Sequence, residues 1–177
     1  RNFNIKSREN YEEKRKIGEN ENYICKLIQN DLIDEFIIYT QKNNYSLNST
    51  IKLSAFETNP YLINKNPTLI EYAAFYGSIR IFLYLKHNNV EINKESFYYI
   101  IHGRNPEIIN IFEESNDLDK EDYKKIIMKS IKCHHNEIVY YILNNFIQYE
   151  EVKSDIIKTS LHFYNFQFIK NEDINSS

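Results

Sequence analysis

The chain has 177 residues, a formal net charge of −3 and 42% hydrophobic residues, which is enough for one core but too little for two large domains. It contains only 3 glycines and 3 prolines. Because β-sandwiches and barrels need many such turn residues, the composition excludes them and predicts an all-α fold. The 22 basic and 25 acidic residues nearly balance, which argues against nucleic-acid binding.

Membrane insertion and secretion are also disfavoured. No apolar run approaches the roughly 20 residues of a membrane span, and the N-terminal residues show no signal-peptide core. The two cysteines, Cys25 and Cys133, suit a reducing compartment in which neither needs to form a disulfide. We therefore expect a cytoplasmic protein.

The first 66 residues predict helices and one long connection. A leading helix is expected around 8–16, and a helix pair over 23–29 and 31–41 meets at Asn30, forming an early degenerate repeat. The segment from 43 to 66 is too long for a plain return loop between helix pairs. We interpret residues 1–66 as an N-terminal helical cap region with a long loop at about 43–66.

A motif of about thirty residues recurs in the rest of the chain. Each copy has an apolar helical stretch, a small or polar corner residue and a second apolar stretch. The corner residues are Gly77, Arg104, His134 and Tyr164, at spacings of 27, 30 and 30 positions. This period accommodates two short helices and a turn. We expect four degenerate repeats at about 67–93, 94–120, 121–150 and 151–170, and a disordered tail over 171–177.

The first of these copies resembles the ankyrin repeat. Residues 68–77 read TLIEYAAFYG and residues 89–93 read NVEIN, against the family pattern T-P-L-H-x-A-A-x-x-G and its G-A-D-V-N return. Thr68 and Glu71 are spaced to form a capping box at the start of the first helix. Gly77 permits the positive φ of the corner. In the later copies other residues replace this glycine, which leaves their corner geometry open.

The chain as a whole is similar to divergent ankyrin-repeat proteins that carry an ankyrin-associated N-terminal domain of unknown function and are abundant in parasitic protists. This resemblance implies an ankyrin-like α-solenoid of stacked helix-turn-helix repeats, which binds another protein. We expect such a module to be monomeric and to have no cofactor.

A cluster of metal-binding or nucleophilic side chains occurs at one corner only. Cys133, His134 and His135 are adjacent, and His102 and His162 occupy equivalent positions in neighbouring copies. Adjacent helical residues point about 100° apart, so three in a row do not converge on one ion. No C-x-x-C or H-E-x-x-H motif accompanies them. We therefore expect no metal site and no catalytic activity.

In ankyrin arrays certain first-helix positions face the concave side of the stack, where rings and imidazoles make effective contacts. Degenerate repeats also pack such rings into widened cores, so both roles stay open. The candidate partner-binding residues are Tyr72, Phe75, Tyr76, Tyr99, His102, Lys129, Lys132, Cys133, Thr159, His162 and Phe163. The leading hypothesis is a protein–protein interaction module without catalytic activity. The alternatives are a helical hydrolase or metal-dependent enzyme using Cys133 and a histidine, and a purely structural capping segment of a longer repeat array.

Overall fold

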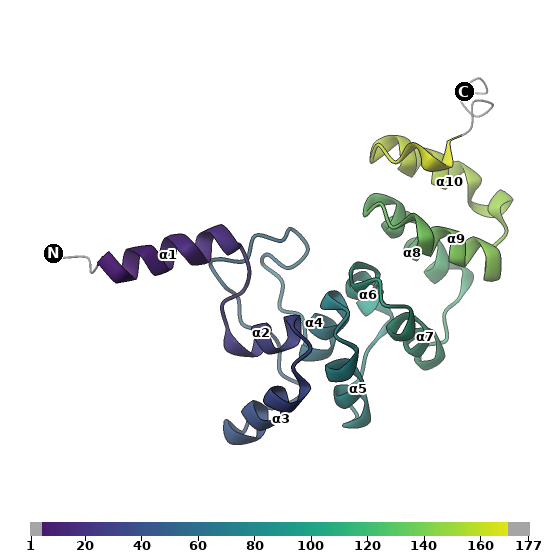
Figure 1. The fold of residues 1–177 in the computed structure, drawn as a ribbon. Coiled ribbons are helices and arrows are strands. Elements are labelled where there is room, and N and C mark those ends of the chain that lie inside the picture. Colours follow the sequence, from purple (N-terminus) through teal and green to yellow (C-terminus); the bar gives the residue numbers. More distant parts are fainter. Residues whose placement is uncertain (1–4, 170–177) are drawn as a thin grey trace. The chain divides into compact units, whose positions relative to one another are not determined.

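Ten α-helices and two short 3-10 helices lie within residues 5–169, the part of the chain that this computed structural model describes (Figure 1). That part contains no strand, only an isolated antiparallel bridge between Thr50 and Thr68. None of its helices is both long and apolar enough to cross a membrane. The predicted all-α fold is confirmed, whereas the predicted tail at 171–177 lies outside the described residues.

The chain divides into two compact units, unit 1 up to residue 91 and unit 2 from residue 92 onward. The boundary expected from the sequence, at 66/67, lies within unit 1. The difference arises because the first ankyrin-like copy packs with the helices before it: α2 contacts α4, and α3 contacts α5. Unit 1 comprises α1 (Ile5–Ile17), α2 (Tyr23–Gln29), α3 (Ile33–Lys42), α4 (Leu69–Tyr76) and α5 (Ile79–His87).

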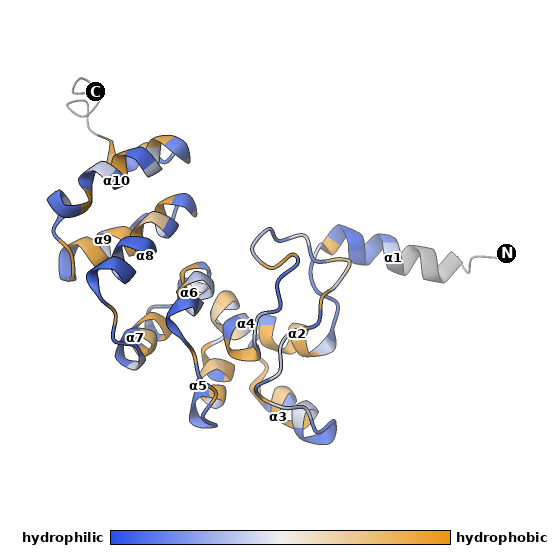
Figure 2. Cartoon of the chain, turned by 180° about the vertical axis from the view of Figure 1, so that it is seen from behind, coloured by the Kyte–Doolittle hydropathy of each residue, from blue (hydrophilic) through white to orange (hydrophobic). Residues whose placement is uncertain are grey.

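Hydropathy separates the helices of unit 1. Most of α4 is apolar, whereas the described part of α1 is mostly hydrophilic (Figure 2). Six of the eight residues of α4 are buried, so this helix lies at the centre of the unit. Apolar side chains of α2, α3 and α5, such as Ile28, Phe36 and Phe82, are buried as well, and hydrophobic burial is the main force that holds the two helix pairs together.

The long connection between α3 and α4 packs on the segment that joins α1 to α2. Ile51 and Leu62 of this connection are buried. The backbone N–H and the Oγ1 hydroxyl of Thr58 both donate to the carbonyl oxygen of Gly18, at 3.0 and 2.8 Å. Asn20 donates from its side-chain amide to the carbonyl oxygen of Lys52 at 2.9 Å. These bonds satisfy backbone groups that a loop of this length would otherwise expose.

The start of α4 follows the sequence prediction. The Glu71 backbone N–H donates to Thr68 Oγ1 at 3.3 Å, and the Thr68 backbone N–H donates to Glu71 Oε2 at 2.8 Å. The capping box is therefore complete. At the other end Gly77 has a φ of +68°, the left-handed conformation that glycine adopts without steric cost.

Unit 2 contains three stacked helical layers. Its elements are η1 (Lys94–Ser96), α6 (Phe97–Gly103), α7 (Pro106–Ser115), α8 (Lys120–Lys132), α9 (Asn136–Asn145), α10 (Tyr149–His162) and η2 (Phe166–Phe168). The first helices pack in sequence, α6 on α8 and α8 on α10, while α7, α9 and η2 each pack on the helix before them. The fully buried side chains between them include Ile127, Ile131, Val139 and Ile156.

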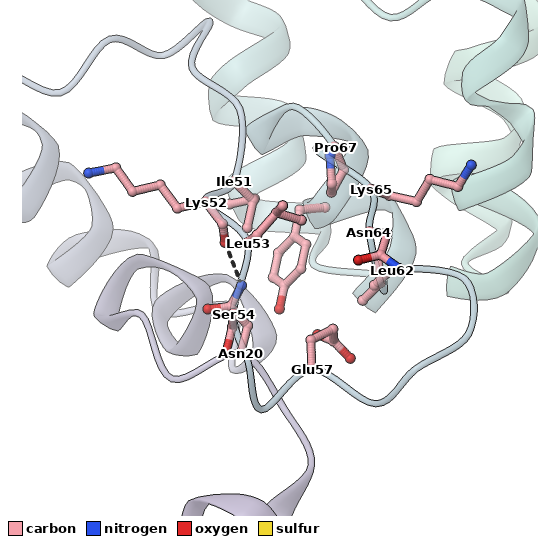
Figure 3. Close-up of a pocket in the computed structure, with 11 residues that line it drawn as sticks. Asn20, Ile51, Lys52, Leu53, Ser54, Glu57, Leu62, Asn64, Lys65 and Pro67 are labelled. Carbon is pink, nitrogen blue, oxygen red and sulfur yellow. Dashed lines mark hydrogen bonds between the residues drawn. The ribbon is translucent and has the colours of Figure 1, made fainter.

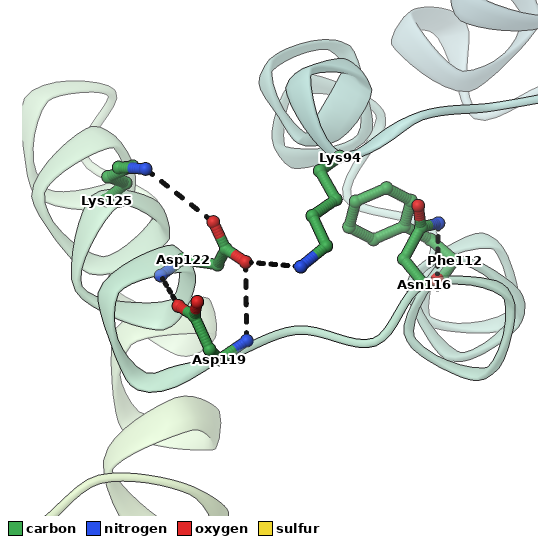
Figure 4. Close-up of polar contacts among 6 residues, drawn as sticks. All are labelled: Lys94, Phe112, Asn116, Asp119, Asp122 and Lys125. Atoms are coloured by element: carbon green, nitrogen blue, oxygen red, sulfur yellow. Dashed lines mark hydrogen bonds and ion pairs between the residues drawn. The ribbon is translucent and has the colours of Figure 1, made fainter.

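An ion pair and a second capping box fix the start of α8 (Figure 4). Asp119 Oδ1 accepts the backbone N–H of Asp122 at 2.9 Å, and Asp122 Oδ2 accepts the backbone N–H of Asp119 at 3.3 Å. Lys94 of η1 donates to the same Asp122 oxygen at 2.9 Å. This bond is the main reason that the pKa of Asp122 is lowered. The polar contacts therefore connect the beginning of one helix pair to the next.

Every helix pair turns through a residue in the left-handed conformation. After four of these residues, the next backbone N–H donates at 2.9 Å to the carbonyl oxygen five positions earlier, the pattern of a Schellman C-cap. The corner thus keeps its geometry where histidine or tyrosine replaces glycine. The earliest corner lies one residue after the predicted Asn30. The corner residues and their φ angles are Asp31 (50°), Gly77 (68°), Arg104 (50°), His134 (58°) and Tyr164 (56°).

The residue after the corner makes the same bond between helix pairs in both units. In unit 1 the Ser78 hydroxyl donates to the carbonyl oxygen of Ile28 at 2.5 Å. In unit 2 the side-chain amide of Asn165 donates to the carbonyl oxygen of Ile131 at 3.0 Å. Ile28 and Ile131 each lie three positions before a corner residue, so the two units stack their helix pairs in the same register.

Because the Ser78 side chain is used in this bond, it does not cap its own helix α5. The carboxylate of the preceding corner residue, Asp31, caps it instead and accepts the backbone N–H groups of Arg80 and Ile81 at 3.1 and 2.9 Å. A carboxylate at a helix N-terminus also interacts favourably with the helix dipole. A corner side chain therefore supports the next helix pair.

Candidate functional site

The predicted contact residues of unit 1 lie mainly in its interior. Tyr72 is only 1% exposed and Phe75 is also buried, while Tyr76 is half-buried. Gln29 of α2 donates to the hydroxyl oxygens of Tyr72 and Tyr76 at 3.0 and 3.2 Å. Tyr72 and Phe75 therefore follow the alternative in which degenerate repeats pack rings into a widened core, and they do not enter the candidate surface.

Tyr72 lines a small cavity, and residues of the long connection such as Ile51 and Leu62 form other parts of its wall (Figure 3). Its volume is about 40 Å³, enough for one or two waters. Glu57 borders the cavity and has one carboxylate oxygen, Oε2, that is buried without a hydrogen-bond partner. Burial is the largest cause of the raised pKa of Glu57. The site is suited to ordered water and too small for an organic substrate.

In unit 2 the stacking register brings Cys133 and His102 together. The Cys133 Sγ lies 3.6 Å from His102 Nε2, and the ring centroids of His102 and His135 are 5.7 Å apart. Lys129 places its Nζ 3.5 Å from the centroid of the Tyr98 ring, a favourable cation–π geometry. These side chains come from α6, α8 and the corner before α9, so no single repeat forms the cluster.

Burial and neighbouring cations keep the imidazoles of this cluster neutral. Burial is the main cause that lowers the pKa of His102 to about 4, with further contributions from His135 and Lys129. The pKa of His135 is lowered by burial and then by Arg104. A neutral imidazole carries a donor on one ring nitrogen and an acceptor on the other. Both rings are therefore equipped for hydrogen bonding at pH 7.

The next layer continues this arrangement at the end of α10. Lys132 Nζ lies 5.0 Å from the centroid of the Phe163 ring, and the rings of His162 and Phe163 meet edge to face with centroids 4.6 Å apart. His134 Nε2 contacts the carbonyl oxygen of Phe163 at 3.2 Å. Lys132 and His162 are exposed, and Phe163 is half-buried.

Two other predicted residues have partly buried positions. Thr159 donates from Oγ1 to Met128 Sδ at 3.1 Å, and Tyr99 is half-buried beside Tyr98, with ring centroids 5.7 Å apart. We use the name last-turn surface for the side chains that unit 2 presents around the ends of its first helices. Its members are His102, Lys129, Lys132, Cys133, His162 and Phe163.

The last layer also leaves apolar side chains uncovered, a feature that the sequence analysis missed. Leu161 lies three positions before its corner, as Ile28 and Ile131 do before theirs. Both isoleucines are fully buried, whereas Leu161 is 51% exposed. Tyr164 and Phe166 beside it are also exposed. Aligning the corner residues in the sequence could have revealed this exposure. Leu161 has the position of Ile28 and Ile131, but no further described helix pair follows to stack on it.

Within residues 5–169 no three His, Cys, Asp or Glu side chains are grouped so that they could hold a metal ion. Comparison with protein-family models, with curated proteins and with solved structures finds no match to this chain. The resemblance to ankyrin repeats therefore rests on the residues that carry it and stays a prediction.

Proposed function

We propose that this chain is an ankyrin-like protein–protein interaction module with no catalytic activity. The recurrence of the same bond between helix pairs in both units supports the proposal, because stacked copies of one repeat produce such a recurrence. Both cysteines are free, as is normal in a reducing compartment such as the cytoplasm. Such a module recognises a partner through a surface that is already ordered, so little conformational entropy is lost on binding.

The observation that carries the proposal is the last-turn surface of unit 2. Its aromatic, imidazole and lysine side chains are held by contacts between layers, such as those of Cys133 with His102 and of Lys132 with Phe163. Rings and long cationic side chains provide large contact areas and are frequent where binding energy concentrates. Preorganisation by these contacts is what a binding surface requires and what a simple capping segment does not need.

The test is affinity capture with the full chain and two matched double variants. Lys132→Ser with His162→Ser removes two exposed side chains of the last-turn surface. Lys120→Ser with His87→Ser removes the same residue types from exposed positions elsewhere. We expect the first variant to lose the proteins that the wild type captures and the second to retain them. If both variants retain the same proteins, the last-turn surface is not the binding surface.

One contact favours a second candidate function, thiol chemistry at Cys133. A cysteine beside a histidine is the arrangement of cysteine hydrolases, and His102 Nε2 lies 3.6 Å from the Cys133 sulfur. However, the pKa of His102 is lowered to about 4, so this ring is not the imidazolium that stabilises a thiolate in such enzymes. The geometry permits proton exchange, whereas the electrostatics disfavour a thiolate–imidazolium pair.

Alkylation kinetics separate these two functions. We expect Cys133 to react with iodoacetamide at neutral pH at the rate of an ordinary thiol, with little change in His102→Gln. Cys25 serves as the unreactive internal reference, because it is fully buried and burial raises its pKa to about 12. A Cys133 that reacts faster than a free-thiol peptide, and loses that advantage in His102→Gln, would favour the hydrolase.

A further inference from the structure

A cavity of unit 2 lies between its second helices α7 and α9. It is a groove of about 310 Å³, at the lower end of the volume range of ligand sites. Its walls are apolar, and its edge is polar. The apolar side chains are Pro106, Ile109, Ile138 and the ring of Tyr141, and the polar ones are Arg104, Asn110 and Glu137.

The corresponding space in unit 1 is filled by an aromatic ring. Phe36, five positions after its corner, meets Tyr84, seven positions after the next corner, edge to face with centroids 6.1 Å apart. Phe36 is fully buried. The same two positions in unit 2 are Ile109 and Tyr141, and both line the groove. In unit 2 the groove thus lies beside an isoleucine, where unit 1 has a phenylalanine at the equivalent position.

Two contacts hold the side chain of Tyr141 in place. The Tyr141 hydroxyl donates to Glu113 Oε2 at 2.8 Å. Its ring contacts Phe146 edge to face, with centroids 5.7 Å apart. Two contacts on opposite parts of the side chain restrict its rotamer, so the aromatic wall exists before any ligand arrives. Aromatic pairs of this kind contribute beyond the area that they bury.

The edge of the groove suits a polypeptide. Arg104 Nε and Glu137 Oε1 form an ion pair at 2.7 Å, and both side chains are about half exposed. A guanidinium has five N–H donors and a carboxylate has several acceptor sites, so the pair offers both kinds of group beside the apolar walls. The backbone N–H and C=O groups that flank a side chain in a peptide need such partners, and a purely apolar molecule does not.

We propose that this groove binds an aromatic side chain of a partner protein. The ring of that side chain would lie against Tyr141 as the ring of Phe36 lies against Tyr84 in unit 1. The proposal rests on the proposed interaction function. It adds a second contact region, apart from the last-turn surface, and specifies what the partner must present there: a phenylalanine-like ring on an accessible segment.

The first experiment titrates the full chain with N-acetyl-phenylalanine amide and follows it by NMR. We expect the methyl signals of Ile109 and Ile138 and the ring signals of Tyr141 to shift together. N-acetyl-leucine amide tests the aromatic class, and we expect it to bind at least about fivefold more weakly because it lacks the aromatic pair. Toluene tests the need for a peptide, and we expect it to bind more weakly than the phenylalanine amide.

The second experiment fills the groove from within. Ile109→Phe restores the ring that unit 1 has, and we expect it to weaken binding of the phenylalanine amide at least about tenfold by occupying the site. Ile38→Phe is the matched control, because Ile38 is exposed in unit 1, and it should bind as the wild type does. Asn110→Phe, at an exposed position on the groove wall, provides a second blocking variant if circular dichroism shows that Ile109→Phe does not fold.

Besides a failure of the phenylalanine amide to bind, three results would overturn the proposal. The first is equal binding of the leucine amide, the second is toluene binding as tightly as the phenylalanine amide, and the third is undiminished binding by folded blocking variants. The interaction function is judged separately by the Lys132 and His162 variants. If those variants lose captured proteins while the phenylalanine amide does not bind, only the groove proposal fails. If the variants retain the captured proteins and the phenylalanine amide does not bind, both proposals fail.

Discussion

A change at the last corner tests whether backbone geometry is conserved where the corner glycine is lost. Tyr164 has a φ of +56° and is 76% exposed, so its side chain contributes little besides a ring contact with Phe166 at 6.3 Å. A left-handed conformation costs a residue with a Cβ about 1–2 kcal/mol. Glycine avoids this cost but loses about 0.5–1 kcal/mol through the entropy of its unfolded chain. Tyr164→Gly should therefore be more stable than Tyr164→Ala by about 0.5–1 kcal/mol.

The comparison with alanine isolates the backbone term, because both variants remove the same ring contact. At an exposed position inside a helix, such as Tyr140 of α9, the order should reverse, with glycine about 1 kcal/mol less stable than alanine. Urea unfolding followed by far-UV circular dichroism measures both differences. A Tyr164→Gly variant that is no more stable than Tyr164→Ala would refute the left-handed corner.

Three further predictions concern stability. Ile131→Ala should lower the unfolding free energy by about 2–4 kcal/mol because Ile131 is fully buried, whereas Leu161→Ala, at the equivalent but 51% exposed position, should cost less than about 1 kcal/mol in the same urea assay. Gly18→Ala should destabilise unit 1 by about 1–2 kcal/mol in thermal unfolding, since its φ is +70° and a Cβ would lie 2.6 Å from Thr58 Oγ1. Folding lowers the pKa of His102 from its ordinary 6.5 to about 4, so between these pH values the unfolded chain has a protonated imidazole and the folded chain a neutral one. The unfolding free energy should therefore fall as the pH decreases from 6.5 to about 4, and it should fall less steeply in His102→Gln.

Local features of the first ankyrin-like copy were predictable because they depend on neighbours in sequence. The capping box needs only Thr68 and Glu71 three residues apart, and the structure contains it. The corner at Gly77 needs only a residue that tolerates positive φ. The corner at Asp31 was placed one residue early, because the αL residue that ends α2 follows the C-cap Asn30.

Features that depend on contacts between helix pairs could not be predicted from the sequence alone. The burial of Tyr72 depends on Gln29 of α2 and on the long connection that lines the cavity beside it. The contact between Cys133 and His102 depends on the stacking register of α6 and α8. In each case the two partners are about thirty or more residues apart, and composition and periodicity carry no information about such a pairing until the register is known.

Loss of the repeat pattern has different consequences at two kinds of position. At the corner the backbone hydrogen bonds hold the αL conformation even when histidine replaces glycine, so the effect of His134 is a local energetic cost and the path of the chain does not change. Five positions after the corner Arg104, Ile109 has a smaller side chain than Phe36 at the equivalent position after Asp31, and no backbone bond can restore that volume. Packed interiors do not close small voids without moving whole helices, and the groove between α7 and α9 lies beside this smaller side chain. A position where one helix pair has a smaller side chain than the equivalent position of another pair is therefore where a contact surface is to be sought.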